Sequence, residues 1–243
     1  MKPLADCRLY TFLDTACLQG RAPEVVAQQL CDGGSDLIQL RAKKSTPEEI
    51  RAMAEKILPV TRRANVGLVI NDHLEIARDL GAELCHLGKE DFFDAGHIHV
   101  SELKGRDARA ARPMASETCA GRPGGATLPE LRIGLSTHSP EQAKRALAAG
   151  ADYLAVGPVY ATGTKPTAKP VTLEYVRWAA APQSGVNVPW FAIGGITLER
   201  LPDVLNAGVD GVAVISNILQ DKDPIAKAKA WLEAYARLVS VRV

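Results

Sequence analysis

One stretch of the chain decides the fold: Phe191-Ala-Ile-Gly-Gly-Ile-Thr-Leu-Glu-Arg-Leu-Pro-Asp-Val-Leu-Asn-Ala-Gly-Val-Asp-Gly-Val-Ala-Val-Ile-Ser216. Its apolar start predicts a strand over Pro189–Ile193 that is buried on both faces. Thr197 is the expected N-cap of a helix that ends at Gly208. A second buried strand is expected over Gly211–Ile215. The stretch therefore predicts a strand–helix–strand unit with parallel strands.

The two strand ends in this stretch predict an anion site. Gly194 and Gly195 leave backbone N–H groups uncovered, and Ser216 follows the second strand. Free amides, small residues and helix N-termini at one rim are typical of phosphate binding. In an eight-stranded α/β barrel that site commonly follows strands seven and eight. The alternative is a glycine pair that only makes a tight turn.

A short sequence pattern repeats four times and indicates that the same strand–helix unit recurs along the chain. A helix-ending Gly, a small residue and an acid precede a short apolar strand at Gly34, Gly81, Gly150 and Gly208. Strands alternating with helices predict a (β/α)8 TIM barrel; an open doubly wound sheet fits less well, because no Gly-x-Gly-x-x-Gly turn follows the first strand. The strands are expected near Arg8–Leu13, Asp36–Arg41, Gly67–Asn71, Glu83–Leu87, Arg132–Leu135, Asp152–Val156, Pro189–Ile193 and Gly211–Ile215.

One segment interrupts this regular pattern. Between Asp91 and Leu131 the chain is longer than a crossover needs, with a short helix expected over His97–Lys104. Gly105–Pro129 is rich in Gly, Pro, Arg and Ala and has no apolar period. We therefore predict a single barrel domain over 1–243, with a surface insertion after the fourth strand at about 92–130.

Composition limits the function classes. The 243 residues are 47% hydrophobic and 23% charged with a net charge of +1, so neither a nucleic-acid partner nor a membrane surface is expected. No apolar run has the length of a signal peptide or a membrane span. Five widely spaced cysteines without a Cys-x-x-Cys pair favour reduced thiols in the cytoplasm. The sequence is compatible with a homo-oligomer but does not determine the oligomeric state.

Polar side chains end the second predicted strand. Alternation puts Gln39, Arg41 and Lys43 on the interior side and Leu40 on the other. Arg supplies a bidentate fork and Lys a point charge, a pair suited to a diphosphate. The alternative is a solvated strand end with ordinary surface charges.

Carboxylates follow the third and fourth strands. Asp72 comes directly after Asn71, and Asp91 follows the strand that contains His86. Two carboxylates on neighbouring strand ends suit Mg²⁺, with water and phosphate oxygens as its other ligands. Asp72 alone would be an ordinary helix N-cap. His86 is expected to be a hydrogen-bonded core histidine.

The fifth and sixth strands end in further polar residues. Ser139 and Pro140 are expected to open a helix, which leaves Ser136 free for an oxygen ligand. A Ser–His nucleophile pair is conceivable, but no nucleophile elbow surrounds it. The loop after the sixth strand is expected to close over substrate, with Lys165 on a phosphate; a plain polar connection is the alternative.

Seven segments together resemble the thiamine phosphate synthase family. They occur in family order and span nearly the whole chain outside the insertion and the ends. They are Gln39-Leu-Arg-Ala-Lys43, Val69-Ile-Asn-Asp72, His86-Leu-Gly-Lys-Glu-Asp91, Gly134-Leu-Ser-Thr-His138, Gly157-Pro-Val-Tyr-Ala-Thr-Gly-Thr-Lys165, Ala192-Ile-Gly-Gly-Ile196 and Val214-Ile-Ser216.

The resemblance implies a Mg²⁺-dependent transferase with two small phosphorylated substrates. It would join an aminopyrimidine methyl diphosphate to a thiazole phosphate, giving thiamine phosphate and pyrophosphate. The implied pyrimidine diphosphate ligands are Gln39, Arg41, Lys43, Asn71, Ser136 and Lys165. The implied metal ligands are Asp72 and Asp91. The implied thiazole phosphate ligands are Thr162, Thr164, Gly195, Ile215 and Ser216.

Two departures and two rival functions accompany this resemblance. Lys89 stands where the family usually has Gln, and the insertion replaces a short connection after Asp91. A related thiazole tautomerase would not need Arg41, Lys43 and the two acids. A non-catalytic phosphate-binding barrel would keep only the glycine and serine cradle.

Overall fold

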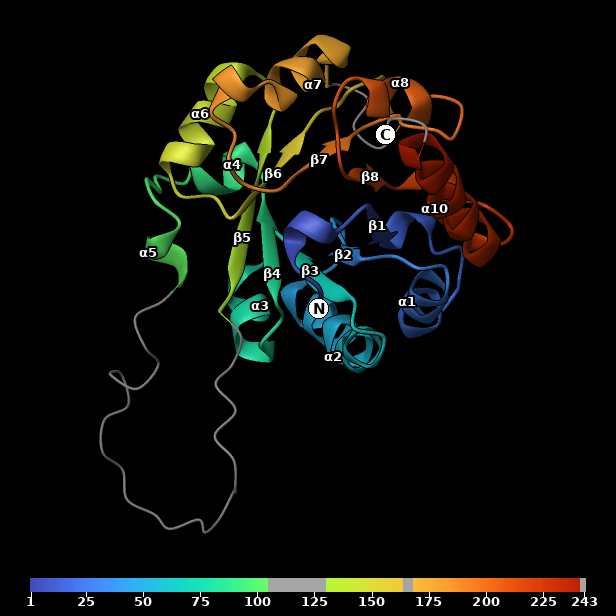
Figure 1. The fold of residues 1–243 in the computed structure, drawn as a ribbon. Coiled ribbons are helices and arrows are strands. Elements are labelled where there is room, and N and C mark those ends of the chain that lie inside the picture. The colour runs from blue at the N-terminus through green and yellow to red at the C-terminus, as the bar shows by residue number, and fades with distance from the viewer. Residues whose placement is uncertain (105–129, 164–167, 241–243) are drawn as a thin grey trace, which may run out of the picture.

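The computed structural model describes residues 1–104, 130–163 and 168–240. Within them, eight parallel strands form a closed barrel in chain order, and the last strand pairs with the first (Figure 1). The predicted TIM barrel is therefore confirmed, and every expected strand lies within two residues of the observed one. The strands are β1 (Leu9–Asp14), β2 (Leu37–Arg41), β3 (Gly67–Asn71), β4 (Leu84–Leu87), β5 (Arg132–Thr137), β6 (Tyr153–Val156), β7 (Trp190–Ile193) and β8 (Val212–Val214).

Helices surround the barrel, and local sequence explains where several begin. Thr46 and Glu49 form a capping box ahead of α2, and the Ser139 side chain accepts a hydrogen bond from the backbone of Gln142 at the predicted start of α6. The helices are α1 (Pro23–Asp32), α2 (Pro47–Arg63), α3 (Leu74–Leu80), α4 (Lys89–Phe92), α5 (Ser101–Lys104), α6 (Pro140–Ala148), α7 (Thr172–Ala180), α8 (Leu201–Asn206), α9 (Ser216–Leu219) and α10 (Pro224–Ser240). Short 3-10 turns occupy Leu4–Asp6, Thr15–Cys17 and Pro182–Ser184.

Strand alternation divides the core into two layers. Tyr10, Phe12 and Phe191 belong to the cluster that fills the barrel interior, and Leu4 packs with them. Residues of the other parity, such as Leu40, belong to the larger layer between strands and helices. The interior cluster therefore forms the floor beneath the carboxyl ends of the strands.

The start of α8 differs from the prediction. The helix begins at Leu201, and Thr197 instead opens a turn in which the Arg200 N–H donates to the Thr197 carbonyl at 3.1 Å. Pro202 explains the difference. A helix capped by Thr197 would place this proline beyond its first turn, where it lacks a needed N–H and its ring clashes with the preceding turn.

The first part of the expected insertion has two residues in the core: Val100 and Leu103 are buried between strands and helices. The helix expected over His97–Lys104 is confined to α5. The segment Gly105–Pro129 lies outside the described residues.

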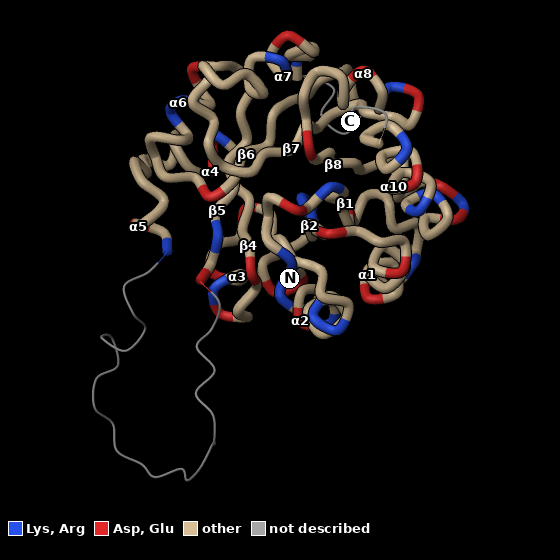
Figure 2. Tube along the Cα trace, viewed as in Figure 1, with Lys and Arg blue, Asp and Glu red and all other residues tan. Residues whose placement is uncertain are grey.

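Charges lie mainly on the outer elements. Acidic and basic residues both occur along α2 and α10 (Figure 2). The four described cysteines, Cys7, Cys17, Cys31 and Cys85, are unpaired. Among the described residues, no helix combines the length and apolar character required to cross a membrane.

Candidate active site

The carboxyl ends of the strands surround a first cavity of about 240 Å³. Side chains from β2 and β5 and from the loops after β3, β4 and β6 reach it. The structure thus brings together residues predicted from separate parts of the chain. The predicted site residues in its lining are Gln39, Arg41, Lys43, Asn71, Asp72, Asp91, Ser136, Thr162 and Ile215.

Arg41 is held by a carboxylate that the sequence analysis missed. Its Nη1 donates to Oδ2 of Asp14, which is only 2% exposed, and Asp14 Oδ1 accepts from the backbone of Ala16 at 3.0 Å. Asp14 ends β1 directly opposite Arg41 in the strand register. The only sequence signal was an acid immediately after an apolar strand. The pair fixes the Arg41 head group at the cavity.

Asp72 and Asp91 lie together at the cavity wall. Asp72 has a left-handed backbone with φ 64°, and its Oδ2 accepts from Lys43 and, at 2.5 Å, from Asn71. Burial, followed by the negative charge of Asp72, raises the pKa of Asp91, and Lys43 partly offsets this. A cation between the two acids would relieve their repulsion.

The donor set fits one hard divalent ion. Mg²⁺ takes one or two protein carboxylates and completes its shell with water and phosphate oxygens, which is the set that Asp72 and Asp91 leave open. Across the described ranges, no group of three or more His, Cys, Asp and Glu side chains could hold a metal. The remaining ligands of an ion here would therefore be water or phosphate oxygens.

His86 is buried and hydrogen-bonded, as predicted, but it also borders the first cavity. Its Nε2 lies 2.9 Å from Ser136 Oγ and its Nδ1 lies 3.2 Å from the Tyr153 hydroxyl. Burial lowers the pKa of His86 to about 4, so the ring is neutral near pH 7. Ser136 therefore lines the cavity while its hydroxyl is also bonded to His86, and its expected role on an oxygen ligand stays a prediction. His138 instead contacts the carbonyl of Gly157.

A second cavity of about 330 Å³ adjoins the first. The two share Thr162, Gly194 and Ile215. Gly195, Ser216 and Lys227 also line the second cavity, and Lys227 is a residue that the sequence analysis missed. Asp221 also lines this cavity and pairs with Lys227, whose Nζ lies 3.6 Å from Asp221 Oδ2.

The glycine pair after β7 is required by both backbone and space. Gly194 and Gly195 have φ values of 99° and 63°. A Cβ on Gly194 would lie 2.4 Å from Cβ of Pro158, and one on Gly195 would lie 2.5 Å from the Ala161 carbonyl oxygen. The pair therefore packs against the loop after β6 as well as lining the second cavity.

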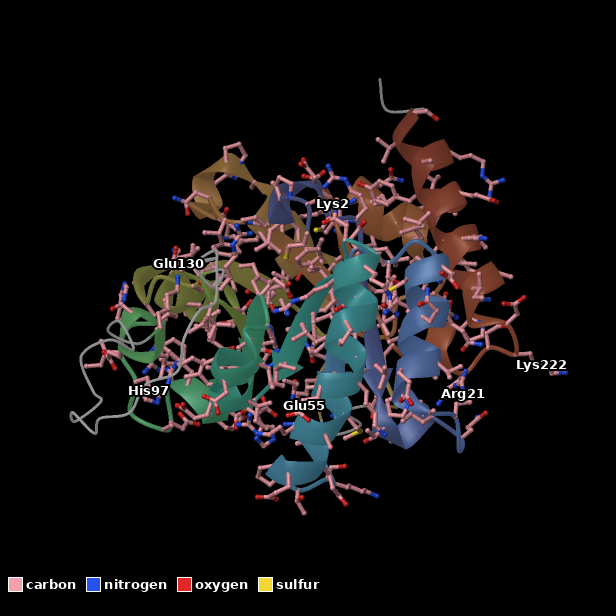
Figure 3. All side chains as sticks on the ribbon, turned by 90° about the horizontal axis from the view of Figure 1, so that it is seen from below. Lys2, Arg21, Glu55, His97, Glu130 and Lys222 are labelled. Carbon is pink, nitrogen blue, oxygen red and sulfur yellow. The ribbon has the colours of Figure 1, made fainter. Side chains whose placement is uncertain are left out.

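Arg21 anchors the element that carries Ser216. Its Nη2 donates to the backbone oxygen of Leu219, the last residue of α9, at 2.8 Å. Arg21 and Lys222 lie at the same edge of the molecule (Figure 3). This contact ties the β8 end of the site to the segment before α1.

Comparison of the sequence with known proteins shows which family the chain belongs to. The sequence pattern described as thiamine monophosphate synthase matches residues 9–111 and 125–218. The chain belongs to that family. It is 39% identical over 201 residues to a thiamine-phosphate synthase from Thermus thermophilus, covering 83% of each chain, and 35% identical over 222 residues to one from Bacillus velezensis, covering 88% of this chain and 85% of the other.

A solved structure supports the fold. A thiamine phosphate pyrophosphorylase from Pyrococcus furiosus has a TM-score of 0.74 and 24% identity, with 97% of this chain and 98% of that chain covered. The family match leaves out residues 112–124, a shorter interval than the insertion expected at about 92–130.

Three residues that the family resemblance singled out lie outside the two cavity linings or outside the described residues. Lys89 donates to Asp94 at 3.1 Å, so its ammonium group is engaged by a carboxylate outside the two cavity linings. Thr164 and Lys165 lie outside the described residues. Their proposed roles on the two substrates therefore stay predictions.

Proposed function

We propose that this protein is a thiamine phosphate synthase. It would couple an aminopyrimidine methyl diphosphate with a thiazole phosphate, releasing pyrophosphate with Mg²⁺ as cofactor. The observation that carries the proposal is the pair of adjoining cavities, one with cations and paired acids and one with backbone amides, that share Thr162, Gly194 and Ile215. Two such cavities suit two phosphorylated molecules whose reacting ends must meet.

The first cavity would bind the pyrimidine diphosphate. Arg41 and Lys43 would bind its phosphate oxygens, and Asp14 keeps Arg41 oriented before substrate arrives. Asp72 and Asp91 would hold Mg²⁺, which when bound supplies charge neutralisation to the leaving pyrophosphate. Lys43, paired with Asp72 here, could then transfer its hydrogen bonds to the diphosphate.

The second cavity would bind the thiazole phosphate. The backbone N–H groups of Ser216 and Asn217 begin the short helix α9 and would donate to phosphate oxygens, whereas those of Ile218 and Leu219 already donate to the Ile215 carbonyl. Lys227 lies at the same wall, where it pairs with Asp221, and would turn its ammonium group to the phosphate. Thr162 lies at the border of the two cavities, where the two substrates would approach.

The bond changes require no protein nucleophile. The C–O bond to the diphosphate breaks with its electron pair going to pyrophosphate, and the electron-rich aminopyrimidine carries the resulting positive charge. The lone pair of the thiazole nitrogen then forms the new C–N bond. The chain's part is to orient both molecules, to stabilise the leaving charge with Arg41 and Lys43, and to exclude water with the aromatic floor of Tyr10 and Phe12.

Pyrophosphate release tests the proposal. Purified protein is mixed with both substrates and Mg²⁺, and each substrate alone serves as the blank. Pyrophosphate formed only with both substrates supports the synthase. None with both substrates would contradict it, and measurable thiazole phosphate binding would then favour a phosphate sensor or carrier. Isomerised thiazole without pyrophosphate would favour the tautomerase.

A substitution of Asp72 tests whether this residue acts only on the diphosphate half of the site. Asp72→Ala should lower kcat by at least about 100-fold while leaving the Kd of thiazole phosphate within about twofold, because Asp72 touches only the diphosphate half. Glu55→Ala, on the outer face of α2 (Figure 3), is the surface control. Equal loss of turnover and thiazole phosphate binding would contradict the assignment.

A further inference from the structure

Arg200 stands just before α8 and contacts the turn that carries the glycine pair. Its Nη1 donates to the carbonyl oxygen of Gly195 at 2.7 Å, and its Cζ lies 4.5 Å from the ring centroid of Tyr160. Neither partner is a carboxylate, so these contacts are not those of an ordinary surface ion pair. Arg200 lines neither of the two cavities. Its contact with the site therefore runs through Gly195 and Tyr160.

The contact with Gly195 fixes the direction of one peptide group. The carbonyl of Gly195 and the N–H of Ile196 belong to the same planar peptide and point in opposite directions. Since the carbonyl is turned to Arg200, the N–H is turned to the other side. Ile196 lines the second cavity and is 4% exposed, and its N–H donates to no described residue. Because unpaired N–H groups are rare in buried residues, this one is left for a ligand.

The glycine pair makes an external restraint on this turn necessary. Gly194 and Gly195 have φ values of 99° and 63°, and without side chains they leave the backbone more freedom than other residues would. Tyr160 restrains the turn from the loop after β6, because its N–H donates to the Gly194 carbonyl at 3.0 Å. The guanidinium of Arg200 contacts both the Gly195 carbonyl and the Tyr160 ring. It thus joins the turn after β7 to the loop after β6.

Resting on the proposed function, we propose that Arg200 is a positioning residue for the phosphate group in the second cavity. It holds the Gly195 carbonyl away from the anion and keeps the Ile196 N–H directed at it. A carbonyl oxygen turned into the cavity would repel phosphate oxygens, whereas the N–H is a donor to them. The hydrogen bond from the guanidinium also polarises the peptide, which strengthens its N–H as a donor. Arg200 itself does not touch the substrate.

A dipeptide that occurs once in the sequence allows a direct NMR test. Gly-Ile is found only at Gly195-Ile196. Protein labelled with isotopes at the glycine carbonyl carbon and the isoleucine nitrogen therefore gives one cross-peak in a spectrum that connects each amide to the preceding carbonyl. Inorganic phosphate should shift the Ile196 amide proton downfield in wild type, and by less in Arg200→Ala. A wild-type Ile196 signal that does not respond to phosphate would overturn the proposal.

Calorimetry with thiazole phosphate measures the size of the effect. Arg200→Ala should raise the Kd about 10-fold, whereas Arg200→Lys, which can still donate to the Gly195 carbonyl, should stay within about threefold of wild type. Both variants should keep the thermal midpoint within about 2 °C, because Arg200 is exposed. Arg51→Ala is the matched control, since it removes the same charge from an exposed ion pair on α2 and should leave the Kd unchanged.

Salt separates positioning from long-range attraction. If Arg200 acted only through its charge, the Kd ratio between Arg200→Ala and wild type would fall toward one at about 0.5 M salt. A peptide held in place by a direct hydrogen bond predicts a ratio that changes by less than about twofold between about 0.05 and 0.5 M salt. In turnover, Arg200→Ala should raise KM for thiazole phosphate about 10-fold and leave kcat within about twofold.

The outcomes separate this inference from the proposed function. Wild-type protein that forms no pyrophosphate contradicts the synthase assignment, whereas the Ile196 titration with inorganic phosphate still reports on Arg200. Equal phosphate responses in wild type and Arg200→Ala, or an affinity loss in Arg200→Ala that disappears at high salt, overturn the inference alone.

Discussion

Asp14 at the end of β1 and Arg41 at the end of β2 face each other in the strand register and form an ion pair. The Asp14 side chain is almost fully buried, while that of Arg41 is 21% exposed at the cavity. The pair thus converts a flexible side chain into a fixed cationic head group at the place where the diphosphate is proposed to bind.

Asp14→Asn should weaken both stability and substrate binding. The amide can still accept from Ala16, so the substitution removes mainly the charge that orients Arg41. We expect a loss of about 1–3 kcal/mol in the free energy of unfolding and a rise of about 10-fold in KM for the pyrimidine diphosphate. Urea unfolding and steady-state kinetics measure the two effects.

An exposed ion pair supplies the control for this prediction. Asp79 pairs with Arg51, and both side chains are largely in solvent. Asp79→Asn should change the free energy of unfolding by less than about 0.5 kcal/mol. Similar losses for Asp14→Asn and Asp79→Asn would show that the buried pair has no special role.

Asp91→Asn should raise thermal stability while abolishing activity. Burial first, and the negative charge of Asp72 second, disfavour the charged form of Asp91 and raise its pKa. Removing the charge should raise the unfolding midpoint by about 1–2 °C for a chain of this length. As pH falls through the raised pKa, wild-type Asp91 becomes protonated, so the difference between the two proteins should shrink.

Calorimetric scans from pH 8 down to pH 4 measure whether the difference in unfolding midpoint between Asp91→Asn and wild type shrinks as the pH falls. Saturating Mg²⁺ with pyrophosphate should stabilise only the wild-type protein, because the variant lacks one of the two proposed ligands. A variant that is less stable than wild type at pH 8 without metal would argue against the repulsion.

Gly194→Ala should unfold the protein more readily than a glycine change at an open site. The new Cβ meets Pro158 and the backbone has φ 99°, so we expect a loss of about 2–4 kcal/mol. Gly20 has φ 81° but nothing within 4 Å of its Cβ position. Gly20→Ala should therefore cost only about 1 kcal/mol, from backbone strain alone. Equal costs in urea unfolding would mean that contact with Pro158 is unimportant.

Replacing residues 105–129 by a short Gly-Ser linker should leave the protein folded. Lys104 Nζ lies 3.8 Å from Glu130 Oε1, so the two flanks are close enough for a short connection. We expect the thermal midpoint to fall by less than about 3 °C and pyrophosphate release to persist. A fall of more than about 10 °C would show that the segment contributes to the folded core.

The barrel could be predicted from sequence because each unit carries its own local signals. A helix-ending glycine, an acid and a short apolar run recur four times, and alternation along β2 correctly put Gln39 and Arg41 on the side opposite Leu40. Helix starts were predictable where a cap stands next to a proline, as at Ser139. The start of α8 was missed because Thr197 resembled a cap while Pro202 set the true first turn.

Partners across the barrel could not be predicted. Tyr153 meets Tyr10 and His86 only because barrel closure brings distant strands together. Asp14 meets Arg41 because the neighbouring strands β1 and β2 pair in one particular register. Period-two alternation says that these side chains point inward, but it does not say which inward residue lies opposite which. The hydrogen bond between His86 and Ser136 was therefore not predicted.

The pairing of β1 with β8 has a consequence for biosynthesis. Leu9, Tyr10 and Thr11 find their last backbone neighbours in Val212, Ala213 and Val214, at the far end of the polypeptide. During translation one edge of β1 stays unpaired until β8 has been made, about 200 residues later. A chain that stops before Val212 would therefore expose that edge to pairing with other chains.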